Sequence, residues 1–107
     1  MLYKFKSKAG ADVIMLAPQG DQLLRLIGRT PSAQGIVEAA DLGAAVSALE
    51  QAVADDEATF AKAQAEAVAA GQTAPRRDGI TLRARMWPMV ELMRRSASAK
   101  ADVVWGV

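Results

Sequence analysis

The sequence predicts an α+β domain in which a small, largely antiparallel sheet packs against one short and two longer helices. A hairpin pattern occupies the first 17 residues, and an apolar strand pattern closes the chain at residues 103–107. Patterns typical of helices lie between them, so strands and helices are segregated along the chain rather than alternating. This order favours an N-terminal hairpin joined by a C-terminal strand over a parallel βαβ array. A length of 107 residues predicts one domain over residues 1–107.

The hairpin is predicted from an alternating segment followed by an apolar one. Tyr3 and Phe5 alternate with lysines, which is typical of a half-buried strand. After a short turn at residues 9–11, the apolar run 12–17 is expected to form the more deeply buried second strand. The other side of the first strand carries a row of lysines: Lys4, Lys6 and Lys8. We expect this row to protect an exposed sheet edge, with contact to phosphates as the alternative.

Two helices are predicted in the middle of the chain. Asp21 is the expected cap of a short helix that stops at Gly28, and residues 36–37 are compatible with a short strand. Asp41 is the expected N-cap of the longest helix, which runs to about Ala70. An apolar seam with 4-3-4 spacing follows one face of this helix: Leu42, Val46, Leu49 and Val53. At 1.5 Å per residue the helix would be about 40 Å long, so we expect it to bend, fray or pack against another chain.

The C-terminal third begins with a polar linker, residues 71–79, which is expected to be mobile within the domain. Thr81 is the expected cap of the last helix. Apolar side chains at helical spacing predict its buried face: Leu82, Met86, Met89, Val90 and Met93. The methionines are interpreted as core residues rather than as the lining of an adaptable groove. In the terminal strand, Trp105 alternates with two valines and is expected to be a buried anchor.

The residue types that are absent exclude several classes of chemistry. The chain has no Cys and no His, which excludes disulfides, thiol nucleophiles, metal sites built on these residues and a Ser-His-Asp triad. It also lacks the glycine-rich phosphate-binding motifs and the nucleophile elbow. We therefore expect no enzymatic activity, no cofactor and no metal. Because there is no secretory signal and no apolar run that could span a bilayer, we expect a cytoplasmic protein without membrane contact.

Charge is segregated along the chain, with an acidic middle between two basic ends. The net charge is +3 over residues 1–37, −6 over residues 38–70 and +4 over residues 71–107. Arginines and a tryptophan of the last segment form a candidate surface for an anion or a partner: Arg76, Arg77, Arg83, Trp87, Arg94 and Arg95. The charge pattern favours the alternative, in which these arginines pair with the acidic long helix. A net charge of only +1 and five aromatic residues argue against nucleic acid as a partner.

Both ends of the chain resemble a known family. Residues 1–8 (MLYKFKSK), 12–16 (DVIML) and 20–22 (GDQ) resemble the opening of a small family of bacterial, chiefly proteobacterial, proteins labelled domain of unknown function 1840. Residues 82–88 (LRARMWP) and 104–107 (VWGV) are similar to two further signatures of that family. The resemblance covers effectively the whole chain and implies a stand-alone bacterial protein. Because the family has no assigned activity, the resemblance implies no catalytic or binding residue.

Together these observations predict a non-enzymatic, self-associating interaction or regulatory module. We expect a homo-oligomer, with a dimer favoured, because a symmetric partner could cover both the apolar second strand and the seam of the long helix. The alternative is a binder of a small anionic ligand or of nucleic acid through the C-terminal arginine cluster.

Overall fold

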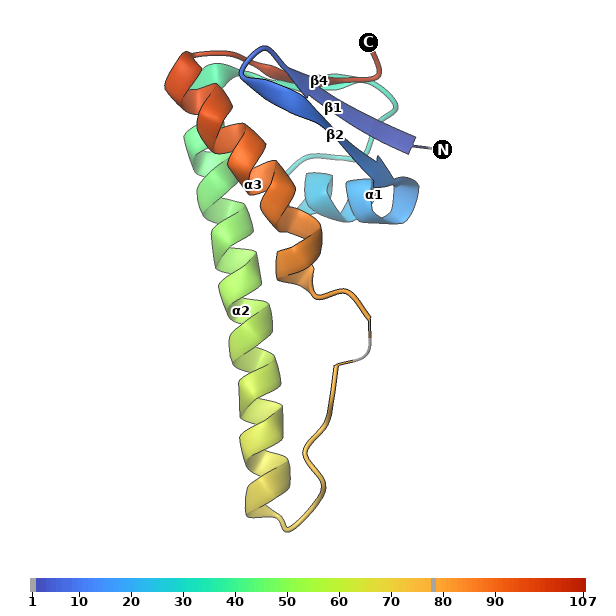
Figure 1. Ribbon diagram of the computed structural model, residues 1–107, viewed down its shortest axis with the longest axis vertical. Coiled ribbons are helices and arrows are strands. Elements are labelled where there is room, and N and C mark those ends of the chain that lie inside the picture. The colour runs from blue at the N-terminus through green and yellow to red at the C-terminus, as the bar shows by residue number, and fades with distance from the viewer. Residues whose placement is uncertain (1, 78) are drawn as a thin grey trace.

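The computed structural model of the chain describes residues 2–77 and 79–107 and has a four-stranded sheet with its α-helices on one side (Figure 1). The strands are β1 (Leu2–Ser7), β2 (Gly10–Leu16), β3 (Gly35–Val37) and β4 (Val103–Trp105). The helices are α1 (Ala17–Leu26), α2 (Leu42–Ala69) and α3 (Leu82–Ala99), and the 3₁₀ turn η1 (Ala39–Asp41) precedes α2. The strands pair antiparallel in the order β2-β1-β4-β3. The predicted α+β fold class is confirmed.

The places of the two hairpin strands in the sheet overturn two predictions. β1 lies between β2 and β4, whereas β2 is an edge strand. Tyr3 and Phe5 of β1 are buried, but within β2 only Met15 is, so the prediction of a more deeply buried second strand was wrong. The prediction that the lysines protect a sheet edge was wrong for the same reason. Lys4 and Lys6 alternate with the buried aromatics of a central strand, so they lie on the outer face of the sheet.

α1 begins four residues before the predicted cap. It starts at Ala17, directly after β2, with Pro18 in its first turn, where a missing N–H group is tolerated. Asp21 therefore lies inside the helix and does not cap it. Its carboxylate instead accepts a hydrogen bond from the Tyr3 hydroxyl, which ties α1 to the central strand. This hydrogen bond, together with burial, raises the pKa of Tyr3. Gly28 follows the helix in a left-handed conformation, with φ of 82°.

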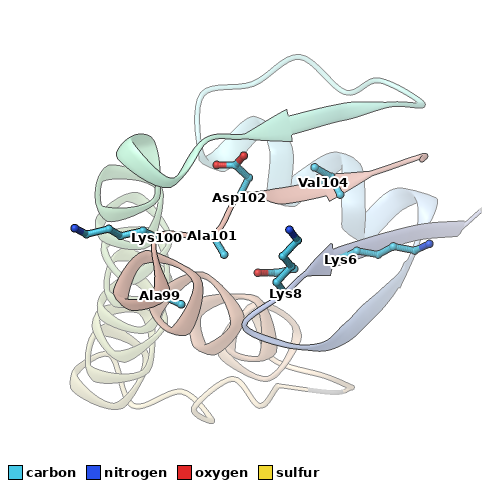
Figure 2. A pocket seen from close by; sticks show the side chains of 8 residues that line it. Lys6, Lys8, Ala99, Lys100, Ala101, Asp102 and Val104 are labelled. Carbon is cyan, nitrogen blue, oxygen red and sulfur yellow. The ribbon is translucent and has the colours of Figure 1, made fainter.

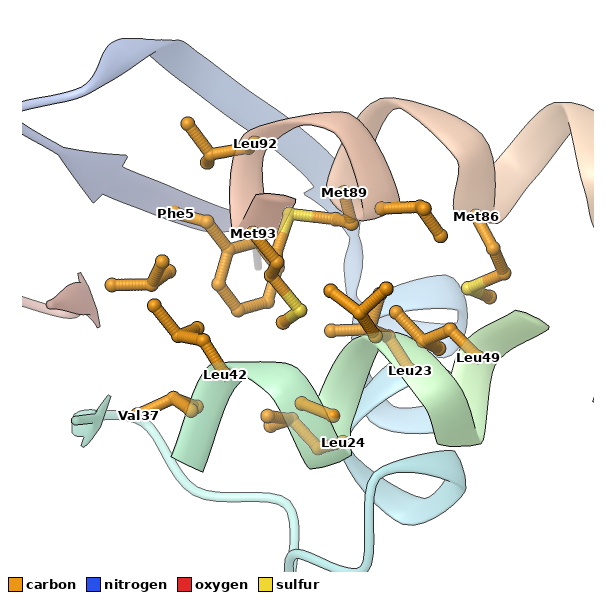
Figure 3. Close-up of a cluster of buried hydrophobic side chains, with 14 of the residues drawn as sticks. Phe5, Leu23, Leu24, Val37, Leu42, Leu49, Met86, Met89, Leu92 and Met93 are labelled. Atoms are coloured by element: carbon orange, nitrogen blue, oxygen red, sulfur yellow. The ribbon is translucent and has the colours of Figure 1, made fainter. Parts of the chain in front are cut away.

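The core fills the space between the sheet and the helices (Figure 3). The apolar seam of α2 is buried over its whole predicted length, at Leu42, Val46, Leu49 and Val53. The stripe of α3 is buried at Met86, Met89, Val90 and Met93, while Leu82 is only partly buried. The two helices pack against each other, and side chains of the sheet and α1 complete the cluster: Phe5, Leu23, Leu24 and Val37. The methionines are therefore core residues, as predicted.

The long helix projects beyond the sheet instead of being shortened to fit under it (Figure 1). α2 has 28 residues, and the longest axis of the molecule is 52 Å. Its buried residues end at Val53. The remaining turns lie beside the segment that leads to α3, where the Gln64 side chain donates a hydrogen bond to the Pro75 carbonyl at 3.2 Å. The predicted linker 71–79 includes Asp78, which lies outside the described residues.

The C-terminal elements dock as the sequence predicts. The Thr81 hydroxyl accepts a hydrogen bond from the Ala84 amide at 3.1 Å and caps α3. In β4, Trp105 is 2% exposed, and its indole N–H donates to the Ser32 carbonyl at 3.0 Å. Gly106 has a φ of 74°, and a Cβ atom there would collide with the Ala33 carbonyl. The packing of the chain end thus requires both Trp105 and Gly106.

Candidate functional site

The predicted arginine surface is largely a set of ion pairs with the long helix. Arg77 donates through Nη1 to the Asp56 carboxylate at 2.7 Å and through Nη2 to the Asp56 carbonyl at 3.0 Å. Arg83 makes a two-pronged contact with Glu57, with donor–acceptor distances of 3.0 and 2.8 Å. Such paired hydrogen bonds between a guanidinium and a carboxylate are the strongest of the surface ion pairs. Two of the candidate arginines therefore fasten the segment before α3, and α3 itself, to α2.

Trp87 lies within reach of two guanidinium groups on the exposed side of α3. The Arg83 guanidinium is 4.7 Å from the centre of the indole ring, and that of Arg94 is 5.3 Å from it. Arg94 is also 3.1 Å from the Glu50 carboxylate. Arg83 and Arg94 thus both contact the Trp87 ring, and each has a carboxylate partner from α2 as well.

The other two candidate arginines lie apart from this set. The Arg95 guanidinium is 3.7 Å from the carboxylate of Glu91, which belongs to the same helix and not to α2. Arg76 is an exposed residue of the segment before α3. The structure thus brings Arg77, Arg83, Trp87 and Arg94 together along α2 and does not bring Arg76 or Arg95 to them.

The ion pair of Arg83 and Glu57 perturbs both of its members. Hydrogen bonds from the Arg83 guanidinium lower the pKa of Glu57 below its ordinary value of 4.5, because they favour the charged carboxylate. The same contact raises the pKa of Arg83, which is charged at every relevant pH. The charges of Arg83 and Glu57 therefore stabilise each other within the chain.

A pocket of about 630 Å³ lies between the C-terminal end of α3 and the strands β1 and β4 (Figure 2). Lys8 and Asp102 point into it, whereas Lys6 and Lys100 point away from its centre. The Asp102 carboxylate also accepts a hydrogen bond from the Ala39 amide at 2.8 Å, which helps to hold the start of η1. The lysines of this pocket therefore do not converge on one anion. Within the described part of the chain, no group of three His, Cys, Asp or Glu residues is placed to hold a metal ion.

The outer face of the sheet carries exposed apolar side chains that no helix covers. Leu2 is 60% exposed, Ile14 is 59% exposed and Leu16 is 60% exposed. Leu2 and Leu16 are direct partners across β1 and β2, and Ile14 follows on the same face of β2. The helices pack against the opposite face (Figure 1). We call Leu2, Ile14 and Leu16 the β2 patch. Lys4, the partner of Ile14, borders it and lies 3.7 Å from Asp12.

The two edges of the sheet are protected to different degrees. The β3 edge is only three residues long, and the Arg29 side chain already donates to the Ile36 carbonyl there, at 2.9 Å. The β2 edge is seven residues long and carries no Lys, Arg or Pro. Among the residues that the structure describes, no side chain makes a hydrogen bond to the β2 backbone. Short length and edge charges are the usual defences of a sheet edge, and the β2 edge has only Asp12.

The chain matches the family described as Domain of unknown function (DUF1840) over residues 1–105. It belongs to this family. The resemblance seen at its two ends is thereby confirmed, and those ends lie side by side, because β1 pairs directly with β4. No curated protein and no solved structure matches the chain. None of the described helices has both the length and the apolar composition needed to cross a membrane.

Sequence reasoning expected the strand that holds Ile14 and Leu16 to be the more deeply buried one, although one signal pointed outward. Asp12, Ile14 and Leu16 alternate on one face of β2, and a charged residue in such a row indicates the solvent side. The high hydrophobicity of the run 12–17 predicts burial of the whole strand and hides the alternation of its side chains between the two faces.

Proposed function

We propose that this chain is a non-enzymatic interaction module that associates with a second copy of itself. The observation that supports this proposal is the β2 patch, three large aliphatic side chains that are each about three-fifths exposed on an uncovered sheet face. Scattered apolar residues are normal on a protein surface, but a contiguous group on a regular face is typical of an interaction site.

The seam of α2 gives the proposal no support. It was one of the reasons to expect a dimer, but its four aliphatic residues are buried against α3 and α1 of the same chain. The argument for self-association therefore rests on the sheet alone. A surface of this size is smaller than the roughly 800 Å² per partner that a standard stable interface buries. We accordingly propose a dimer that forms in the micromolar range and separates on dilution.

Sedimentation velocity over a range from low micromolar to millimolar concentration tests this proposal. The monomer has a mass of 11.3 kDa, so a rise toward twice that value with concentration is expected. Ile14→Lys should shift the rise to higher concentration because it places a charge in the middle of the apolar patch. Val68→Lys is the matched control, since Val68 is 64% exposed but lies near the far end of α2. A mass that stays at that of the monomer throughout would contradict the proposal.

The alternative function, anion binding through the arginine cluster, has less support from the geometry. Arg77, Arg83 and Arg94 each have a carboxylate partner within 3.1 Å, and an added anion would have to displace it.

The proposal also keeps the cytoplasmic location expected from the sequence, because small secreted domains are typically rich in disulfides and this chain has no Cys.

A further inference from the structure

We propose that two copies of this chain pair through their β2 edges, antiparallel about a two-fold axis at Ile14, and so join their four-stranded sheets into one continuous sheet. This inference rests on the proposed self-association and specifies its geometry. Three observations support it: the difference between the two sheet edges, the positions of the lysines on the outer face, and the alternation of side chains along β2.

The edges decide which strand can accept a partner. β3 offers three residues, and the carbonyl of its middle residue, Ile36, is occupied by Arg29. β2 offers seven residues whose outward amide and carbonyl groups have no side-chain partner among the described residues. Because unpaired backbone groups on a long edge are a ready template for another strand, β2 is the edge that fits a second copy.

The lysines decide between pairing at the edge and stacking of the outer faces. Lys4 and Lys6 lie on the outer face between the β2 patch and β4. Stacking two such faces would press these lysines against those of the other copy in a layer without water, which is costly. Edge pairing separates Lys4 from its copy by three strand spacings, about 14 Å. That distance exceeds the Debye length of about 8 Å at physiological salt, so the repulsion is screened.

The alternation along β2 selects the register. With the axis at Ile14, this residue faces its own copy and Asp12 faces Leu16 of the other copy on the outer side, while Val13 faces Met15 of the other copy on the inner side. An axis at Val13 would instead bring the two Asp12 residues from four residues apart along the strands to two, about 7 Å, and so increase the repulsion between their carboxylates. An axis at Met15 would require Ala17 to pair as a strand, but Ala17 already begins α1. In the chosen register, Asp12 keeps its contact with Lys4 of its own chain.

The absence of cysteine makes the geometry directly testable by disulfide formation. Residues directly opposite in an antiparallel pair have Cα atoms about 4.5 to 5.5 Å apart, which is within the range that a disulfide can bridge. The test uses three single variants in a glutathione redox buffer: Ile14→Cys, Lys4→Cys and Ile36→Cys. Lys4→Cys reports face-to-face stacking, and Ile36→Cys reports pairing through the other edge. Non-reducing electrophoresis measures the linked dimer, and sedimentation of each reduced variant measures association independently.

The Ile14→Cys variant should form at least about tenfold more linked dimer than either control at concentrations where the reduced protein is dimeric, because the controls place their Cα atoms beyond disulfide reach. The linked fraction should fall on dilution together with the sedimentation mass. A dimer that is linked as well through Lys4→Cys or Ile36→Cys would overturn the edge geometry and leave self-association standing. A reduced protein that remains monomeric would overturn both.

Discussion

Gly20 gives a sharp test of the packing between α1 and the sheet. It is an interior residue of α1, and replacing a helical glycine by alanine normally stabilises a protein by up to about 1 kcal/mol. Here, however, a Cβ atom at Gly20 would lie 2.6 Å or less from three atoms of the Tyr3 ring. Ordinary contact distances are near 3.5 to 4.0 Å, so the ring or the helix must move. We expect Gly20→Ala to destabilise the fold.

The cost follows from how firmly the Tyr3 ring is held. Its side chain is 3% exposed, its hydroxyl donates to Asp21, and its ring stacks on Phe5 with 5.7 Å between the ring centres. Overpacking a core typically costs about 1–3 kcal/mol, and an overlap this deep lies at the upper end. After the gain in helix propensity is subtracted, about 2 kcal/mol of net destabilisation remains. For a domain of this size that corresponds to a fall of roughly 8 °C in melting temperature.

Thermal unfolding followed by circular dichroism measures this effect, and Gly43→Ala is the matched control. Gly43 is also helical, in α2, but an added Cβ atom there would meet nothing within 4 Å. The control should therefore raise the melting temperature by a few degrees, through a gain of about 0.5–1 kcal/mol. In a Tyr3→Leu background, where the side chain is shorter and rotates more freely, Gly20→Ala should cost less than in the original protein. If Gly20→Ala stabilises the chain as much as Gly43→Ala does, the packing argument is wrong.

Three further predictions concern the ion pairs and the tryptophans. The lowered pKa of Glu57 implies that its pair with Arg83 stabilises the fold above about pH 4.5 and that this contribution is lost as the pH falls through the folded-state pKa. Glu57→Gln should therefore flatten the pH dependence of the unfolding free energy between pH 5 and 3, and an unchanged slope would contradict it. Trp105→Ala should cost about 3–5 kcal/mol in chemical denaturation, and the fluorescence of Trp105 should be bluer than that of the half-buried Trp87. Millimolar phosphate should raise the melting temperature no more than chloride at equal ionic strength, and a specific rise that is lost on replacing Arg83, Arg94 and Arg95 by Gln would favour the anion-binding alternative.

The elements that the sequence predicts well are those whose signal is local. The stripe of α3, its Thr81 cap and the alternation of Trp105 with valines are each determined by neighbours within a few residues, and the structure has all three. The start of α1 was missed because a proline that follows an apolar strand pattern, as Pro18 does, is typical of a strand end, although a proline is equally suited to the first turn of a helix. Local patterns therefore identify an element more reliably than they identify where it begins.

The candidate site was harder to predict because its features depend on which strands are neighbours. Whether a row of lysines lies at an edge or on a face is decided by β4, which pairs with β1 from the other end of the chain. The same pairing leaves β2 as the edge, and Ile14 and Leu16 are exposed because they lie on the face of the sheet opposite the helices. No property of residues 1–17 alone distinguishes a hairpin whose first strand is central from one whose second strand is central. The ion pairs of α2 were more accessible to prediction, because charge segregation along the chain indicated partners without their geometry.

The division of charge also explains how α2 can extend beyond the core. Its second half has no apolar residue buried in the core, so hydrophobic packing does not hold it in place. Polar contacts from the segment before α3 replace that packing: Arg77 binds Asp56 and lies 4.3 Å from the Phe60 ring centre, and Gln64 binds the Pro75 carbonyl. Because these contacts are partly or fully open to solvent, each contributes only about 0–1 kcal/mol. The outer turns of α2 are therefore the least stable part of the helix, and they lie at the end of the molecule opposite the sheet (Figure 1).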